Sequence, residues 1–189
     1  MKVLATDLPG VMIIEPKVFG DTRGFFMETW NQARYEELGL PAVFVQDNLS
    51  YSHKGVLRGL HFQNPNAQGK LVYVLQGEVY DVAVDIRVGS PTFGKSVGVL
   101  LSSENKRQFY IPAGFAHGFC VTSETVLFAY KCTEVYQPQS EHGLDWQDPD
   151  LGIQWPLEKP MLSEKDQHYP RLKDLEPRLL PRYRGGESG

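Results

Sequence analysis

Two histidines and a lysine stand in apolar, glycine-containing segments where their side chains could do chemistry. His61 follows Arg58-Gly59-Leu60, Lys70 comes soon after it, and His117 ends the segment 111–117. An imidazole can bind a metal ion or move a proton near neutral pH. A lysine ammonium offers only hydrogen-bond donors and repels a cation. These residue types could therefore serve metal binding or proton transfer, although a single histidine more often has a structural role.

The alternation of side chains along a strand limits how Arg58 and His61 could share one site. In a regular strand every second side chain points to the same side, so Arg58 and His61 would lie on opposite sides. Both can enter one site only if the strand is bulged or strongly twisted, and we expect this irregularity near Gly59.

The elements that must position these residues are mostly strands. Segments of strand-like composition, separated by glycine and proline turns, recur about every 8–12 residues, which is typical of a sandwich or barrel. Strands are predicted at residues 10–14, 25–30, 43–46, 55–62, 71–75, 79–88, 96–101, 108–111, 118–122 and 125–136. One clear helix is predicted at 31–38, with Asn31 as its N-cap and Gly39 closing it.

The strongest strand pattern covers residues 71–88. Two apolar arms meet at Gln76-Gly77-Glu78, which predicts a hairpin. In the second arm the alternation puts Tyr80, Val82, Val84 and Ile86 on one face, and Asp81 and Asp85 on the other. After about residue 140 the sequence becomes irregular and rich in proline, with a short helical piece near 163–167. We therefore predict a single domain, 1–189, in which a barrel of about 1–140 carries a wrapped tail of about 141–189.

The composition excludes several classes of protein. The 189 residues are 41% hydrophobic and 12% aromatic, which argues against disorder. A net charge of −4 argues against binding to nucleic acid. No apolar run reaches the roughly 18 residues that span a membrane, and the N-terminus does not read as a signal peptide. The only two cysteines lie in apolar runs, which favours a reduced, cytoplasmic location.

The spacing of Gly55, His61, Gln63, Lys70 and Gly77, followed by the segment 111–117, resembles the two motifs of the cupin jelly-roll barrel. In metal-binding cupins the first motif offers two histidines and a glutamate. Here Gln63 and Lys70 stand at the positions of the second histidine and the glutamate, so the resemblance implies an all-β cupin-type jelly-roll barrel with no metal. This argues against a metal-dependent cupin oxygenase, while a non-catalytic sugar-binding cupin stays as an alternative.

Longer motifs resemble the RmlC-type dTDP-4-dehydrorhamnose 3,5-epimerases, from about residue 3 to about residue 180. They lie at 20–26, 46–48, 56–61, 112–119, 130–132, 151–156 and 162–166. The resemblance implies a homodimeric enzyme that inverts C3 and C5 of dTDP-4-dehydro-6-deoxy-D-glucose without a cofactor. An epimerase acting at C3 or C5 alone, on another dTDP-4-keto-deoxysugar, is the alternative.

The resemblance also implies roles for four catalytic residues. His61 is similar to the family's general base, and Asp166 to the carboxylate that orients it. Tyr130 matches the proton donor on the opposite face of the sugar, and Lys70 would stabilise the enolate oxygen. On spacing alone, Tyr136 shares a strand face with Tyr130 and could equally be the acid.

The resemblance implies a further set of substrate-binding residues. These are Arg23, Arg58 and Lys165 near the diphosphate or sugar, Glu28, Gln46, Asn48 and Glu141 near the deoxyribose and thymine, His117 in the sugar site, Phe26 against a ring, and Tyr136 as a packing or gating neighbour. Without the resemblance, each arginine would more often form a solvated surface pair.

Overall fold

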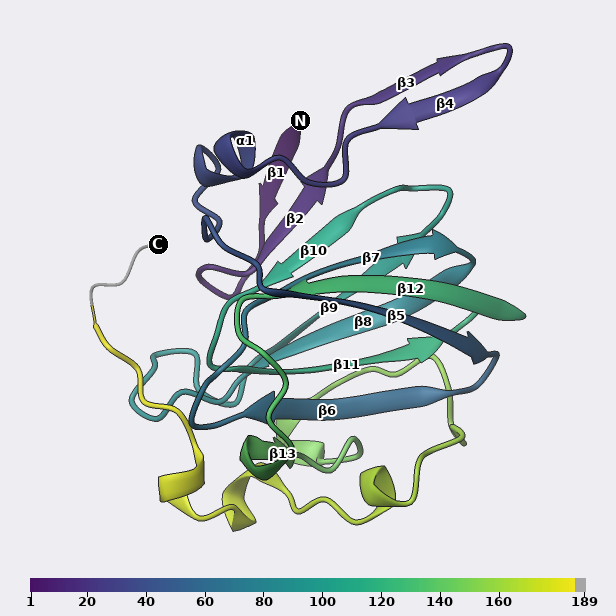
Figure 1. Ribbon diagram of the computed structural model, residues 1–189. Coiled ribbons are helices and arrows are strands. Elements are labelled where there is room, and N and C mark those ends of the chain that lie inside the picture. Colours follow the sequence, from purple (N-terminus) through teal and green to yellow (C-terminus); the bar gives the residue numbers. More distant parts are fainter. Residues whose placement is uncertain (186–189) are drawn as a thin grey trace.

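A computed structural model describes residues 1–185 and shows two antiparallel sheets that face each other (Figure 1). One sheet has six strands in the order β1-β2-β10-β7-β12-β5, and the other has five in the order β13-β6-β11-β8-β9. The strands are β1 (Lys2–Ala5), β2 (Met12–Glu15), β3 (Val18–Asp21), β4 (Gly24–Met27), β5 (Gln46–His53), β6 (Leu57–Gln63), β7 (Lys70–Gln76), β8 (Glu78–Asp85), β9 (Ser96–Ser102), β10 (Gln108–Ile111), β11 (Phe115–Val121), β12 (Thr125–Cys132) and β13 (Glu141–Gly143). The predicted all-β architecture is confirmed.

Among the described residues, the strands β3 and β4 pair only with each other, and they form an arm that projects from the body (Figure 1). The helix α1 (Gln32–Glu36) follows this arm, and the Asn31 side chain caps it by accepting a hydrogen bond from the Arg34 backbone N–H at 3.2 Å. The predicted helix and its cap are therefore confirmed. Within residues 1–185, no helix is long and apolar enough to cross a membrane.

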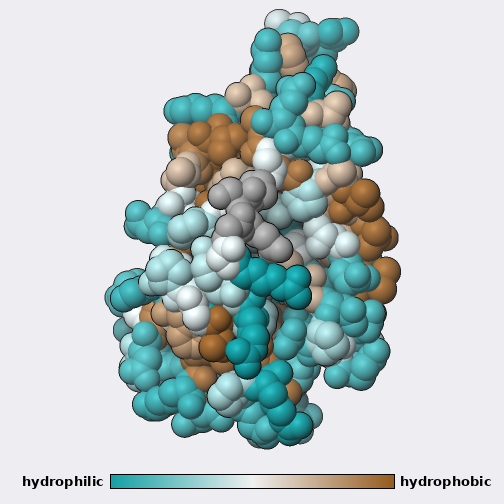
Figure 2. Space-filling view, turned by 90° about the vertical axis from the view of Figure 1, so that its left-hand side faces the viewer, coloured by the Kyte–Doolittle hydropathy of each residue, from teal (hydrophilic) through white to brown (hydrophobic). Residues whose placement is uncertain are grey.

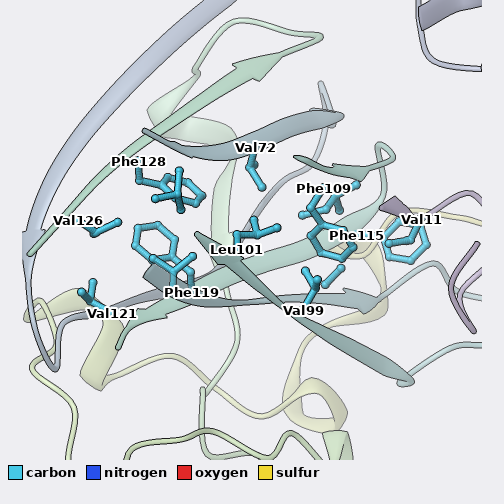
Figure 3. Packing of buried hydrophobic residues seen from close by; sticks show 14 of the residues in the cluster. Val11, Val72, Val99, Leu101, Phe109, Phe115, Phe119, Val121, Val126 and Phe128 are labelled. Carbon is cyan, nitrogen blue, oxygen red and sulfur yellow. The ribbon is translucent and has the colours of Figure 1, made fainter. Parts of the chain in front are cut away.

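Apolar side chains from both sheets fill the space between them. Phe119 and Phe128 stack with ring centroids 4.2 Å apart, and Phe109 and Phe115 lie farther along the same core (Figure 3). Each such aromatic side chain removes a large apolar area from water, which stabilises the pairing of the sheets.

The predicted hairpin at Gly77 is wrong. The strands β7 and β8 lie in different sheets: β7 pairs with β10 and β12, whereas β8 pairs with β9 and β11. Gly77 has a φ of +84°, and a Cβ there would lie 2.1 Å from the Thr125 carbonyl oxygen. The glycine therefore allows a tight connection from one sheet to the other, and it does not form a hairpin turn.

The outer face of the five-stranded sheet is covered by the chain after β13. Side chains of this segment pack against the strands in one apolar cluster, which contains Leu60, Phe62, Val82, Val84, Ile86, Leu144, Leu151, Leu172 and Leu180. The segment contains the short 3₁₀ turns η2 (Pro149–Leu151), η3 (Lys165–Gln167), η4 (Leu172–Asp174) and η5 (Pro177–Leu179), and η1 (Pro138–Ser140) precedes β13. As a result β8 is buried on both faces.

Two strand predictions need the largest corrections, and three short strands fall outside the predicted ranges. Residues 43–45 lie outside the sheets, and the strand in this region is β5. Its even-numbered side chains are polar, so this segment lacks the apolar pattern by which strands are predicted. The predicted strand at 125–136 ends at Cys132, because the chain leaves the sheet there. The short strands β1, β3 and β13 were not predicted, since four or three residues carry little periodicity.

Candidate active site

A cavity of about 580 Å³ opens between the two sheets and is closed on one side by the segment around η3. Its volume is in the range of pockets that bind small molecules. Eleven of the fourteen predicted site residues line it: Gln46, Asn48, Arg58, His61, Lys70, His117, Tyr130, Tyr136, Glu141, Lys165 and Asp166. The structure thus brings together residues that are up to 120 positions apart in the sequence.

The irregularity expected near Gly59 is confirmed. His61 pairs with His117, but Arg58 pairs with Phe119, so the register between β6 and β11 shifts by one residue. Gly59 has a φ of +125°, and a Cβ there would lie 2.6 Å from the Cα of Gly118. The extra residue turns both Arg58 and His61 toward the cavity.

His61 forms a hydrogen bond with the carboxylate of Asp166. The Nε2 atom of His61 lies 2.7 Å from Oδ1 of Asp166, and the two side chains are 23% and 3% exposed. Burial raises the pKa of Asp166, but the hydrogen bonds from His61 and Gly59, together with the charge of His61, outweigh it and hold the pKa below its ordinary value. An ionised carboxylate therefore orients the imidazole, as a general base requires.

A second imidazole–carboxylate pair lies at the wall of the cavity, which His117 lines and Asp81 does not. The Nε2 atom of His117 is 2.9 and 3.0 Å from the two carboxylate oxygens of Asp81, and both residues are buried. Burial lowers the pKa of His117, which favours the neutral imidazole donating Nε2–H to Asp81. The stacked Phe128 ring, 6.4 Å from the imidazole, forms the apolar wall beside it.

Asp81 is a site residue that the sequence analysis did not identify. It is fully buried in the middle of β8, and its charge acts on both His117 and Lys70. The sequence carries one signal for this role, because Asp81 is a carboxylate within an apolar strand. If both faces of that strand are covered, the buried carboxylate needs a hydrogen-bond or charge partner.

Lys70 and Tyr130 reach the cavity from the six-stranded sheet. Within residues 1–185, the Lys70 ammonium forms no ion pair or hydrogen bond with another side chain, and burial lowers the pKa of this lysine. Burial also raises the pKa of Tyr130, so its phenol keeps its proton at neutral pH. The Lys70 amino group and the protonated phenol of Tyr130 thus line the same cavity as the His61 imidazole, from the opposite sheet.

Three residues are connected at the edge of the cavity. The carboxylate of Glu141 accepts hydrogen bonds from the Tyr136 hydroxyl at 3.0 Å and from the Lys165 ammonium at 2.8 Å. Tyr136 is 47% exposed and lies beyond the end of β12, whereas Tyr130 lies within that strand. The two tyrosines, equivalent on sequence spacing, therefore occupy different environments.

Polar side chains of β5 extend the cavity away from His61. The Gln46 side-chain amide donates to Asn48 at 2.9 Å, and both side chains face the cavity. The Nε atom of Arg58 donates to the Ser52 hydroxyl at 3.1 Å. Within residues 1–185 its two terminal nitrogens have no such partner, so they can bind a ligand.

The other three predicted residues do not line this cavity. Arg23 and Phe26 lie on the β3–β4 arm, where Arg23 pairs with Asp21 and the exposed fractions are 88% for the Arg23 side chain and 68% for Phe26. Glu28 follows the arm and binds Arg34, with 2.9 Å between Oε1 and Nη1. Among residues 1–185, no group of three or more His, Cys, Asp or Glu side chains could hold a metal ion.

Residues 5–174 match the family described as dTDP-4-dehydrorhamnose 3,5-epimerase. The chain is 60% identical over 168 residues to a dTDP-4-dehydrorhamnose 3,5-epimerase of Shigella flexneri, covering 88% of this chain and 93% of that protein. It is 39% identical over 186 residues to a dTDP-4-dehydrorhamnose 3-epimerase of Streptomyces niveus, covering 97% and 90% of the two chains.

The fold agrees with this sequence similarity. The crystal structure of dTDP-6-deoxy-D-glucose-3,5-epimerase RmlC from Legionella pneumophila, in complex with dTDP-4-keto-L-rhamnose, matches with a TM-score of 0.95 and 57% identity, covering 97% of this chain and 99% of that one. The two-sheet barrel is therefore of the cupin type that the sequence motifs implied. Both comparisons and the paired His61 and Asp166 in the cavity lead to one conclusion: the chain belongs to the dTDP-4-dehydrorhamnose 3,5-epimerase family.

Proposed function

We propose that this enzyme inverts C3 and C5 of dTDP-4-dehydro-6-deoxy-D-glucose, with His61 as general base and Tyr130 as general acid. The observation that carries the proposal is their arrangement: His61 and Tyr130 belong to opposite sheets and line the same cavity. An inversion needs a proton removed from one face of the sugar and another added to the opposite face. Two proton-transfer groups on opposing walls meet this requirement.

The chemistry follows from the C4 ketone of the substrate. The ketone acidifies the protons on C3 and C5, so His61 can take either proton and leave an enolate. The developing charge on the C4 oxygen would be stabilised by Lys70, whose ammonium has no side-chain partner within residues 1–185. One such preorganised donor is typically worth about 3–4 kcal/mol. Tyr130 then returns a proton from the other face, and solvent restores both groups.

The remaining cavity residues suit the nucleotide part of the substrate. Arg58 would bind the diphosphate, because its planar guanidinium can form two parallel hydrogen bonds to phosphate oxygens. Gln46 and Asn48 would contact the deoxyribose and thymine. Glu141, Lys165 and Tyr136 would exchange some of their mutual hydrogen bonds for contacts with the ligand at the edge of the cavity.

The test of this function is proton NMR of the substrate in deuterated water with chelator-treated wild-type enzyme. We expect the signals at both C3 and C5 to disappear through exchange, together with formation of dTDP-4-dehydro-L-rhamnose. We expect full activity after chelation, because a lysine in the place of a metal ligand repels a cation. Exchange confined to one carbon would assign the enzyme to the single-position epimerases. No exchange at either carbon, or activity restored only by a divalent ion, would refute the proposal.

We also propose that the enzyme is a homodimer in which the β3–β4 arm of each copy binds substrate in its partner's cavity. The support is the arm itself, which carries the predicted ligands Arg23 and Phe26 on an exposed projection with the apolar side chains Phe19 and Phe25. The edge strand β5 adds exposed Leu49 and Tyr51. Hydrophobic patches also interrupt the polar surface in Figure 2. We further propose a cytoplasmic location, supported by two buried free cysteines.

Complementation between two impaired variants tests the arm exchange. Arg23→Ala should weaken kcat/KM about 10- to 100-fold, since a hydrogen bond to a charged group is worth about 1.5–3 kcal/mol. Co-expressed with His61→Ala, it should yield mixed dimers that contain one complete site, and roughly a quarter of wild-type activity should return. Each variant expressed alone is the control. If Arg23 served its own cavity, the mixture would show no gain over the separate variants.

A further inference from the structure

Gly143 lies directly opposite His61 in the ladder between β13 and β6. Residues that face each other across two antiparallel strands have their side chains on the same face and in contact. A glycine at this position leaves His61 without a cross-strand neighbour from β13, on the strand that carries the proposed base.

The ring of Tyr169 fills the space that this glycine leaves. A Cβ on Gly143 would lie 2.3 Å from Cε2 and 2.5 Å from Cδ2 of Tyr169, so any side chain there would displace the ring. The same ring contacts the imidazole of His61, with centroids 5.8 Å apart and an interplanar angle of 73°. This edge-to-face geometry is a favoured arrangement of two aromatic rings.

One short segment supplies both contacts of His61. Asp166, in η3, binds Nε2, and Tyr169 follows three residues later. The next residue, Pro170, accepts a hydrogen bond from the Asp145 backbone N–H at 2.8 Å, which fixes this segment beside the end of β13. Tyr169 itself does not line the substrate cavity. Its ring therefore contacts the imidazole without lining the cavity.

We propose that Tyr169 is a positioning residue for the general base, and that Gly143 is required because the Tyr169 ring occupies the place of a side chain at that position. This inference rests on the proposed role of His61. The ring holds the imidazole in the orientation that Asp166 defines, and the phenol hydroxyl is not needed for this task.

Kinetics of four variants test the proposal. Tyr169→Ala should lower kcat about 10- to 100-fold, the order of loss expected when a catalytic group moves by about 1 Å, with KM nearly unchanged. Tyr169→Phe keeps the ring and should retain wild-type kcat. Gly143→Ala should lower kcat to a similar extent, because Gly143 lacks a positive φ and the three atoms nearest to the new methyl group all belong to the Tyr169 ring. His142→Ala, on the same strand, is the control and should stay near wild type.

The double variant Gly143→Ala/Tyr169→Ala is the decisive measurement. Without the ring the three atoms nearest to the new methyl group are gone, so we expect the double variant to be no slower than Tyr169→Ala alone. NMR gives a readout apart from activity: the ring-proton signals of His61 should move in Tyr169→Ala, while those of His117 stay. The inference would be overturned if the kcat losses of the two single variants multiply in the double variant. It would also be overturned if Tyr169→Ala changes only KM, or if its kcat equals that of the wild type. If wild-type enzyme exchanges neither C3 nor C5, it is the proposed function that fails instead.

Discussion

Replacing His61 by Asn or Ala is expected to abolish the exchange of hydrogen with solvent at both C3 and C5. A general base contributes about 10²–10⁴-fold to the rate, and the loss is larger where no other group can take the proton. In the cavity the nearest alternative imidazole, His117, is held by both carboxylate oxygens of Asp81. If His61 is the single base for both carbons, as proposed, its removal stops both reactions.

The measurement is deuterium incorporation at each carbon, followed by proton NMR under single-turnover conditions. His61→Asn is the preferred variant, because its amide can still donate to Asp166, whereas His61→Ala leaves that buried carboxylate short of a partner. His53→Asn is the matched control, since His53 stands at the end of β5 and does not line the cavity. Asp166→Asn should cost less than either His61 variant if Asp166 only orients the base. Near-normal exchange at C3 or C5 in His61→Asn would show that another base acts there.

Replacing Tyr130 by Phe is expected to separate the two proton transfers. The phenol proton is lost, but the ring and its packing beside Phe128, with centroids 6.0 Å apart, remain. Because His61 and Lys70 are intact, the enolate still forms. It is then reprotonated by the same imidazole, which returns the original configuration. Formation of the epimer should fall about 10²–10⁴-fold, while deuterium incorporation falls far less, provided that the imidazole exchanges its proton with solvent first.

Both quantities are measured in one sample, so the ratio of epimer to deuterium incorporation is independent of enzyme concentration. Tyr136→Phe is the matched control and should keep this ratio, because its hydroxyl is engaged by Glu141. Equal loss of exchange and inversion in Tyr130→Phe would mean that Tyr130 is needed to form the enolate. Undiminished inversion would transfer the acid role to Tyr136 or to water.

Several features of this protein follow from the sequence alone, because they depend on neighbouring residues. The helix at 31–38 is capped by Asn31, and local apolar patterns predict the strands at 96–101 and 108–111. The irregularity at Gly59 was also predictable, since Arg58 and His61 could not otherwise share a site. The family resemblance added the cavity residues of the two sheets, which periodicity alone could not have assembled.

Contacts between distant segments decided the rest. The alternation in 79–86 correctly separates Asp81 from Tyr80 and Val82, but a period of two cannot tell what covers each face. The chain after β13 covers one face of β8, and the barrel interior covers the other, so Asp81 is forced to pair with His117. Contacts between distant segments also decide that Gly77 joins two different sheets. They likewise place the Tyr169 ring in the space beside Gly143. A local pattern states which side chains share a face, whereas burial and partnership depend on the segment that packs there, and only the tertiary structure determines which segment that is.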